Sequence, residues 1–452
     1  MHKLLFKQID NTGLVLFRVV FGLLISIEAF GAIATGWVRR TVVEPDFTFN
    51  FIGFEFLQPL VGETMYLYFV VMGIFGLMVM FGYKYRFSMI AFALMWSAVY
   101  LLQKSAYNNH YYLMMLLCWM MAILPAHRWI SIDVKLRPNL QSNTMPQWCL
   151  LVLIFQVWLV YTFASIAKLY PDWLNGNVIA LFMSSKNEYW LVGEFLQLEW
   201  IQQSIIYVGI LFDLLIVPLL LWKRTRTIGF IISVFFHLFN SIVFQIGIFP
   251  YMSIAFTLFF FSSETLKKRF IPRKYAVKLE SKVTSHSYNK PRKGNYVLLS
   301  LLCFYFVIQL ALPLRHWFFT DDVLWTEEGH RLSWRMMLRS KTGYTTIYIQ
   351  DKKTKEKSKY NIKEMLTKKQ QKIVGTKPDV IWQLAQRIKH IQAQKGKDVA
   401  VFANTRVRVN GSPYHRLIND TIDLGQEKWS PFTHQRWILP APKKLAATAT
   451  KN

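Results

Sequence analysis

The chain has 452 residues, of which 53% are hydrophobic and 17% charged, and its formal net charge is +27. Several apolar runs approach or exceed the roughly 18 residues of a membrane-spanning helix, which excludes a soluble globular protein. Much of the positive charge lies in short loops beside these runs and in a basic C-terminal region, without any stacking motif or zinc spacing. Nucleic acid is therefore excluded as the partner.

The apolar runs predict an α-helical membrane bundle of about nine transmembrane helices. These are expected at 12–37, 64–81, 87–102, 111–124, 147–168, 205–222, 228–244, 248–261 and 296–314. Arg18 and Glu28 in the first helix should face the bundle interior, because a charge facing lipid is costly. The segment 45–60 is aromatic and broken by proline, so we expect it to be interfacial or re-entrant. The segment 175–203 should lie along the membrane interface.

The basic loops predict the topology. Placing GYKYR, HRWISIDVKLR, KRTR and KKRFIPRK in the cytoplasm lets nine helices alternate without conflict. The N-terminus is then cytoplasmic and the C-terminal domain extracytoplasmic, with Arg39 and Arg40 as the exception. The three cysteines lie in or beside apolar runs, so they are expected to be buried and to form no disulfide framework.

The composition becomes that of a soluble domain at Arg315, which divides the chain into a transmembrane domain, 1–314, and an α+β domain, 315–452. Residues 343–362 alternate around an Asp-Lys-Lys turn and predict a hairpin. Residues 377–396 have apolar positions at helical spacing before a glycine, and residues 398–411 alternate again.

Lys168 closes the fifth expected helix, and Pro171 prevents the helix from continuing. One interpretation is a lysine at a helix end that reaches the lipid headgroups. The other is an amine held in a partly dry pocket, where it can act as a base.

Other polar residues are expected at the same membrane depth as Lys168. Asn109 and His110 lie at the outer end of the fourth helix, and His237 and Asn240 lie in the outer half of the seventh. Ionisable and amide groups brought to one level by three separate segments favour a buried site over isolated packing residues.

Seven motifs along the chain resemble those of the vitamin K-dependent gamma-glutamyl carboxylases. They are FRVVFGLL, KSAYNNHYYL, AKLYPDW, FHLFNSIVFQIGIFPY, LPLRHW, LSWRMMLRS and KWSPF. Their order and spacing also agree with that family. The chain looks like a shorter, bacterial member, so the bacterial inner membrane is favoured over the endoplasmic reticulum.

The resemblance implies that Lys168 deprotonates vitamin K hydroquinone and that reaction with oxygen then produces a strong base. This base removes a proton from the γ-carbon of a peptide glutamate, CO2 adds there, and the quinone leaves as its epoxide. His110 is implied in the glutamate step, and Asn109, His237 and Asn240 beside the quinone. The implied partners are membrane lipid, the lipid-soluble quinol, and a glutamate-containing peptide or protein. The co-substrates are O2 and CO2, and no metal is expected.

The motif LSWRMMLRS departs from the family pattern. An acid and a histidine of that pattern are Arg335 and Arg339 here, beside Trp334, on the side expected to bind the peptide. The two arginines either hold a glutamate carboxylate or point to solvent or headgroups. Quinol chemistry is therefore better supported than carboxylation. The alternatives are a quinol epoxidase with little or no carboxylase activity, and a non-catalytic transporter or lipid-binding protein of the same fold.

Overall fold

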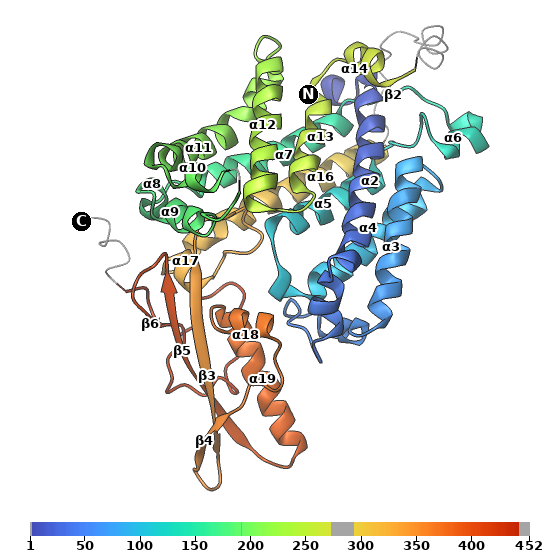
Figure 1. The fold of residues 1–452 in the computed structure, drawn as a ribbon. Helices are drawn as coiled ribbons and strands as arrows, with labels where there is room; N and C mark the ends of the chain where they lie inside the picture. The colour runs from blue at the N-terminus through green and yellow to red at the C-terminus, as the bar shows by residue number, and fades with distance from the viewer. Residues whose placement is uncertain (1, 191, 273–292, 443–452) are drawn as a thin grey trace.

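The computed structural model describes residues 2–190, 192–272 and 293–442. A bundle of α-helices forms one part of the molecule, and a sheet with two helices packs against one end of it (Figure 1).

Each of the nine predicted apolar runs is helical in the structure. The helices are α2 Thr12–Ala34, α3 Thr64–Phe81, α4 Tyr85–Leu102, α5 Asn109–Ile123, α7 Trp148–Ile166, α11 Glu199–Leu221, α12 Arg226–Phe244, α13 Phe249–Phe256, which continues as η5 Thr257–Phe260, and α16 Lys293–Leu314. Among the described residues, seven helices are long and apolar enough to span a membrane, and α5 and α13 are not among them. The protein therefore has the predicted membrane-helix character, but the count of nine spanning helices is not confirmed.

Close packing within the bundle depends on small residues where helices meet. A Cβ atom at Gly22 of α2 would lie 2.4 Å from the Met80 backbone nitrogen of α3. Arg18 is buried as expected, and its guanidinium donates to the carbonyls of Ala126 and Trp129 just beyond α5. The charge is thus satisfied inside the bundle.

Short elements connect the helices. In chain order they are α1 His2–Leu5, η1 Arg39–Val43, η2 Glu55–Leu60, η3 Lys104–Ala106, α6 Ile132–Leu136, η4 Pro138–Leu140, α8 Pro171–Leu174, α9 Asn177–Ser184, α10 Gly193–Gln197 and α14 Ser263–Phe270, with the paired strands β1 Gln8–Asp10 and β2 Thr144–Pro146. After α16, η6 Arg315–Phe318 and α17 Val323–Thr326 lead to the α+β domain. The expected interfacial segment 175–203 thus contains α9 and α10. Of the three cysteines, Cys303 on α16 is exposed, contrary to the expectation that all three are buried.

The C-terminal part has the predicted α+β composition. Its antiparallel sheet has the order β4-β3-β5-β6, made of β3 Lys341–Asp351, β4 Lys357–Tyr360, β5 Val399–Val409 and β6 His415–Arg416. The Asp351 carboxylate accepts hydrogen bonds from the Lys353 and Thr354 amides, which forms the expected hairpin turn. Helix α19, Pro378–Gln394, packs on the sheet beside α18, Lys368–Val374. The buried positions alternate along β5, as the sequence predicts.

Segment 45–60 was expected to be interfacial or re-entrant, and its first part is instead buried in the α+β domain. Phe47 and Phe49 are almost fully buried, and they belong to the hydrophobic core of the α+β domain. The Gln370 side chain of α18 donates to the Phe47 carbonyl at 2.7 Å, and the Arg387 guanidinium lies 3.8 Å from the centre of the Phe47 ring. This segment therefore attaches the α+β domain to the bundle.

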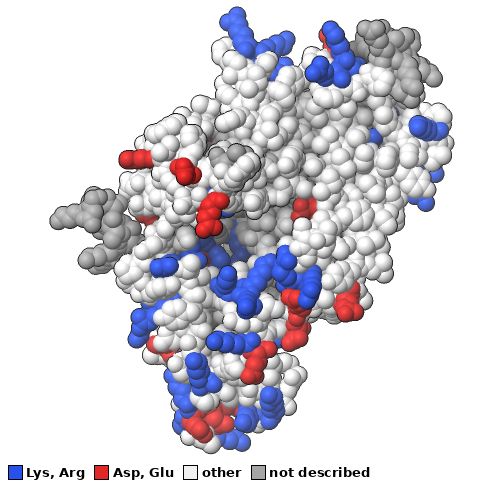
Figure 2. All heavy atoms as spheres, viewed as in Figure 1, with Lys and Arg blue, Asp and Glu red and all other residues white. Residues whose placement is uncertain are grey.

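The predicted basic loops gather at the end of the bundle opposite the α+β domain. The Asp133 carboxylate accepts from the Lys84 amide at 2.7 Å, which joins two of these loops. Lys267, at the start of a third, pairs with Asp10 near the N-terminus; the rest of that loop, 273–292, lies outside the described residues. Figure 2 shows a largely uncharged band across the helices, with most Lys and Arg at the two ends and on the α+β domain.

We expect cysteines placed at Lys223 and at Lys353 to be labelled from opposite sides of the membrane. Both side chains are exposed. Lys223 lies between α11 and α12 and Lys353 between β3 and β4, at opposite ends of the molecule (Figure 1). The measurement is labelling by an impermeant maleimide before and after permeabilisation, in a variant without the native cysteines. A cysteine at Lys84 is the control and should behave like that at Lys223. Labelling of positions 223 and 353 from the same side would contradict the topology.

Candidate functional site

A cavity of about 390 Å³ lies between α7, α11 and α12, beside α9 and α10. Most of its lining is aromatic or aliphatic. Its lining residues are His110, Tyr161, Lys168, Trp173, Ile179, Phe182, Phe195, Trp200, Ile201, Ser204, Ile205, Val208, Gly209, Asp213, Ile232, Phe235, Phe236, His237, Phe239, Asn240, Phe244, Ile246, Phe249, Met336 and Met337. Its size and apolar walls are typical of sites for small hydrophobic ligands.

Four of the predicted site residues line this one cavity: Lys168, His110, His237 and Asn240. Lys168 follows the C-terminal end of α7, where the Ser165 hydroxyl donates to the Ile210 carbonyl of α11 at 3.0 Å. His237 and Asn240 lie three residues apart on α12, so they share a helix face. The start of α5, the end of α7 and helix α12 thus come together at this cavity, as expected.

Lys168 is buried, with 9% of its surface exposed, and its amine forms an ion pair with the Asp213 carboxylate of α11. Its other contacts are weak: the Gly209 carbonyl lies 3.5 Å from Nζ, and the Trp173 ring centre lies 5.6 Å away. A lysine that reaches the lipid headgroups would be exposed, so the buried and paired Lys168 does not fit that interpretation. Asp213 was not predicted, although a lone acid in the apolar run GILFDLLIVP is itself a signal for a functional membrane residue.

His237 contacts Tyr161, which, like Asp213, was not predicted from the sequence. The Tyr161 hydroxyl lies 2.9 Å from His237 Nε2, while His237 Nδ1 is buried without a hydrogen-bond partner among the residues that the structure describes. A buried nitrogen of this kind is expected to meet a polar group of a ligand. His110 stacks on Phe249, with the ring centres 4.1 Å apart.

The two shorter helices, α5 and α13, begin at this cavity. His110 is the second residue of α5, Phe249 is the first of α13, and both line the cavity. At about 1.5 Å per residue, the 15 residues of α5 cover about 22 Å, against roughly 30 Å for the hydrocarbon core. The positive ends of two helix dipoles therefore lie near His110 and favour negative charge there.

One side of the cavity is formed by residues on the outer surface of the bundle. Val208 of α11 and Phe235 of α12 line the cavity and are 51% and 74% exposed. On a membrane helix, such apolar exposed positions face lipid. A lipid-soluble molecule can therefore approach the cavity between α11 and α12. Among the described residues, no group of three or more His, Cys, Asp or Glu is placed to hold a metal ion.

A second cavity, of about 230 Å³, adjoins the first and shares His110, Met336 and Met337 with it. Its walls are polar and strongly basic. Its basic lining residues are Lys104, His110, His330, Arg331, Arg335 and Lys377. No Asp or Glu is among the described residues that line it. Asp379, outside the lining, pairs with Lys104 and Arg331, and Glu327 pairs with Lys377. The lining cations outnumber these two acids, so the cavity is suited to a negatively charged ligand.

Asn109 and Arg335 lie in the wall of this basic cavity. Asn109 Nδ2 donates to the Arg335 carbonyl at 3.0 Å, and its Oδ1 accepts from the Tyr107 hydroxyl at 2.8 Å. Asn109 is therefore not brought into the apolar cavity with His237. The Arg335 guanidinium lies 3.4 Å from His316 Nε2.

Trp334 and Arg339 line neither of these two cavities. Trp334 is fully buried and stacks on Tyr112, with the ring centres 4.8 Å apart. Arg339 pairs with the buried Glu327 carboxylate. The expectation that both arginines face an open channel, or else solvent, does not hold for Arg339.

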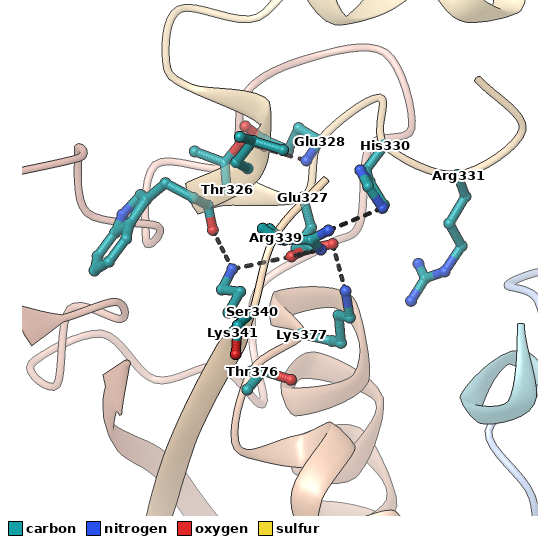
Figure 3. A network of polar contacts seen from close by, with 12 residues as sticks. Thr326, Glu327, Glu328, His330, Arg331, Arg339, Ser340, Lys341, Thr376 and Lys377 are labelled. Atoms are coloured by element: carbon teal, nitrogen blue, oxygen red, sulfur yellow. Dashed lines mark hydrogen bonds and ion pairs between the residues drawn. The ribbon is translucent and has the colours of Figure 1, made fainter. Parts of the chain in front are cut away.

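Glu327 is the centre of a cationic network (Figure 3). Its carboxylate accepts from Arg339, from Lys341 at 3.1 Å and from Lys377 at 2.6 Å. Burial alone would raise the pKa of Glu327, but the three cations hold that pKa well below its usual range. Burial, with the like charge of Arg339, lowers the pKa of Lys377 to about 7. Three cations share one carboxylate here, so the network carries excess positive charge beside the basic cavity.

The backbone between Glu327 and Met337 is unusual. Glu327, Leu332, Trp334 and Met337 all have positive φ angles, between 51° and 67°. Such conformations are uncommon for residues other than glycine and cluster at functional sites. This segment joins the bundle to the α+β domain and supplies residues to both cavities.

Comparison with known protein families assigns both parts of the chain. The family model "HTTM domain" matches residues 6–264, and the family model "Vitamin K-dependent gamma-carboxylase, lumenal domain" matches residues 294–444. No solved structure matches the chain. The two family matches together cover both cavities and the segments that line them.

Proposed function

The chain belongs to the vitamin K-dependent gamma-carboxylase family, and we propose that it is a membrane enzyme coupling two reactions. The first is oxygen-dependent epoxidation of a reduced naphthoquinone. The second is carboxylation of glutamate in a peptide or protein.

The apolar cavity is the observation that carries this proposal. It gathers Lys168, His110, His237 and Asn240 within walls that suit an aromatic ring system, and it adjoins lipid-facing residues of α11 and α12. A quinol dissolved in the bilayer meets there a basic group at one wall and imidazole and amide groups at another. The cavity therefore supports a lipid-soluble quinol as co-substrate.

The residues then have distinct roles. Lys168 receives or directs the proton of a quinol hydroxyl, while His237 and Asn240 orient the ring through its oxygen atoms. Reaction of the deprotonated quinol with oxygen supplies a base far stronger than any side chain, which a γ-carbon proton requires. The mainly apolar walls limit competing protonation by water.

The basic cavity supports the glutamate reaction. Lys104 and Arg331 already pair with the buried Asp379 carboxylate at 2.5 and 2.6 Å. Arg335 lines the same space and has no ion-pair partner among the described residues, so we infer that it offers charge-assisted hydrogen bonds to a carboxylate. His110 is shared by both cavities, so it lies between the proposed quinol and glutamate positions. This arrangement favours the coupled reaction over quinol epoxidation alone.

One observation favours the quinol epoxidase as a second candidate. Arg339, expected to help hold the glutamate, is already engaged by Glu327 and lies 3.1 Å from His330 Nε2. Arg335 alone of the two arginines lines the basic cavity. Peptide binding at this position therefore rests on different partners from those of the family pattern.

The deciding experiment is turnover of reduced vitamin K by the purified protein, with and without oxygen, in the presence of labelled CO2 and a glutamate peptide. The proposal expects oxygen-dependent epoxide and labelled peptide. Epoxide without labelled peptide would support the quinol epoxidase. If neither product forms, the protein would instead be a transporter or a lipid-binding protein.

With a peptide suited to the animal enzymes, we expect more epoxide than carboxyglutamate. The reason is that Arg335 and the engaged Arg339 replace the acid and the histidine of the family pattern. Both products are measured in the same sample. A ratio of carboxyglutamate to epoxide near one would contradict this expectation.

A further inference from the structure

The uncovered face of the sheet in the α+β domain is the basis of this inference. Helices α18 and α19 pack on the other face, where Ile347, Val401 and Ala403 belong to the domain core. Because side chains alternate along a strand, the residues next to these point to the uncovered face. Five cations lie there: Lys357 and Lys359 of β4, Arg406 and Arg408 of β5, and Arg416 of β6. Among the described strand positions on this face, none is Asp or Glu.

The three arginines form a cluster in which like charges meet. Arg406 and Arg416 are directly opposite each other across β5 and β6, and Arg408 lies two residues from Arg406 on the same face. Like charges directly opposite on a sheet reduce its stability. Among the described residues, the one ion-pair partner of the cluster is Asp420, 3.5 Å from Arg416. The cluster is therefore incompletely neutralised, and a bound anionic group would relieve the repulsion.

Aromatic rings hold some of these cations in place on the sheet. The Arg408 guanidinium lies 5.2 Å from the centre of the Tyr414 ring, and its Nε donates to the Thr342 hydroxyl at 3.0 Å. The Lys357 amine lies 4.8 Å from the centre of the Phe402 ring. A cation over a ring keeps N–H donors free at its edge, so it can still bind a carboxylate.

The cations are spread along the strands and do not gather only near the membrane. The central strand β3 runs away from the bundle (Figure 1). Arg408 is paired with Thr342 and Lys357 with Gln350, so the two cations are eight positions apart along β3. At about 3.3 Å per residue this separation is roughly 26 Å. Lipid headgroups beside the bundle can reach only the nearer end of the face, whereas an extended acidic chain can follow its whole length.

We propose that this face binds an acidic segment of the protein that the enzyme carboxylates, separate from the glutamate that reacts. The inference rests on the proposed function, which expects a glutamate-containing protein as substrate. The basic cavity lies toward the helices, since Ile373 of α18 lines it. One bound protein therefore contacts the domain at two separate places. The face recognises carboxylates through charge complementarity and charge-assisted hydrogen bonds.

The test is the binding of a fluorescein-labelled oligoaspartate peptide to the whole protein in detergent, measured by anisotropy. Arg406→Gln/Arg408→Gln should weaken binding roughly 5- to 30-fold, and added salt should weaken binding by the wild type. Lys368→Gln/Lys372→Gln is the matched control. It removes two exposed cations from α18, which covers the opposite face, so it should bind as the wild type does. Absence of binding by the wild type, or equal binding by the arginine variant, would overturn the proposal.

Competition identifies the class of ligand. Unlabelled oligoaspartate should displace the labelled peptide at a lower concentration than dioctanoyl phosphatidylglycerol does. The opposite order would assign the arginine cluster to lipid headgroups and would also overturn the proposal.

Turnover gives a second readout. In the wild type, an aspartate-rich extension should lower the KM of a glutamate peptide, with little change in kcat. The arginine variant should lose this advantage, while its KM for the peptide without the extension stays as in the wild type. An extension without effect on the KM of the wild type would contradict the proposal. Absence of turnover in the wild type itself would count against the proposed function, whereas the anisotropy measurement needs only binding.

Discussion

Lys168→Ala is expected to lose oxygen-dependent quinol oxidation, with a fall of roughly 10²- to 10⁴-fold. The variant removes the amine that faces the cavity and with it the cation beside the proposed quinol position. Epoxide formation by the purified variant is the measurement. Lys186→Ala is the matched control, since Lys186 contacts Tyr189 in the same outer region and does not line the cavity.

The structure changes one part of this expectation. From sequence, Lys168→Ala should fold normally, but the buried Asp213 carboxylate would lose its ion-pair partner. Breaking a buried pair in this way costs about 3–5 kcal/mol. The double variant Lys168→Met/Asp213→Asn removes both charges and should fold better than Lys168→Ala while remaining inactive. If Lys168→Ala formed epoxide at the wild-type rate, Lys168 would have no catalytic role and would be a lysine at a helix end.

Glu327→Gln is expected to destabilise the α+β domain by about 3–5 kcal/mol. The substitution leaves Arg339, Lys341 and Lys377 close together without their shared carboxylate. Unfolding followed by tryptophan fluorescence gives the measurement, because Trp325 and Trp437 lie in the core of that domain.

The control is Glu328→Gln. Glu328 is as well buried, but its partners are His434 and the Gln435 amide, so a smaller loss of about 1–3 kcal/mol is expected. The pH dependence has a definite sign. Because the folded-state pKa of Glu327 is lowered, its contribution is present above the ordinary glutamate pKa and is lost as pH falls through the folded-state value. The difference in the free energy of unfolding between wild type and Glu327→Gln should therefore shrink as the pH falls. A difference that grows in acid would contradict the stabilising role of Glu327.

Hydropathy predicted the positions of the membrane helices well because each is a long apolar run. It predicted their number less well, because α5 and the α13–η5 segment are too short for length to decide whether they span. Period-two alternation predicted β5 because one face of that strand is buried. It also predicted β3, in which Ile347 is the buried residue and the other positions are partly buried or exposed. The segment 45–60 was misjudged because its aromatic residues are buried by a domain almost 300 residues later in the chain.

The candidate site shows a similar division. Lys168, His110, His237 and Asn240 could be placed at one depth from topology alone, since helix ends fix their level. Tyr161 and Asp213 required knowledge of how α7, α11 and α12 are rotated toward one another. The network of Glu327, Lys341 and Lys377 joins three distant stretches of sequence, and no local pattern marks it.

The burial of Phe47 and Phe49 in the α+β domain bears on how the protein is made. These residues are synthesised with the first membrane helix, whereas the strands and helix that cover them come last. The core of the α+β domain cannot close until the first and last parts of the chain meet across the finished bundle. During synthesis Phe47 and Phe49 must therefore remain uncovered until the α+β domain is made, and premature termination would leave them so. Assembly of this domain thus acts as a late check that the bundle before it is complete.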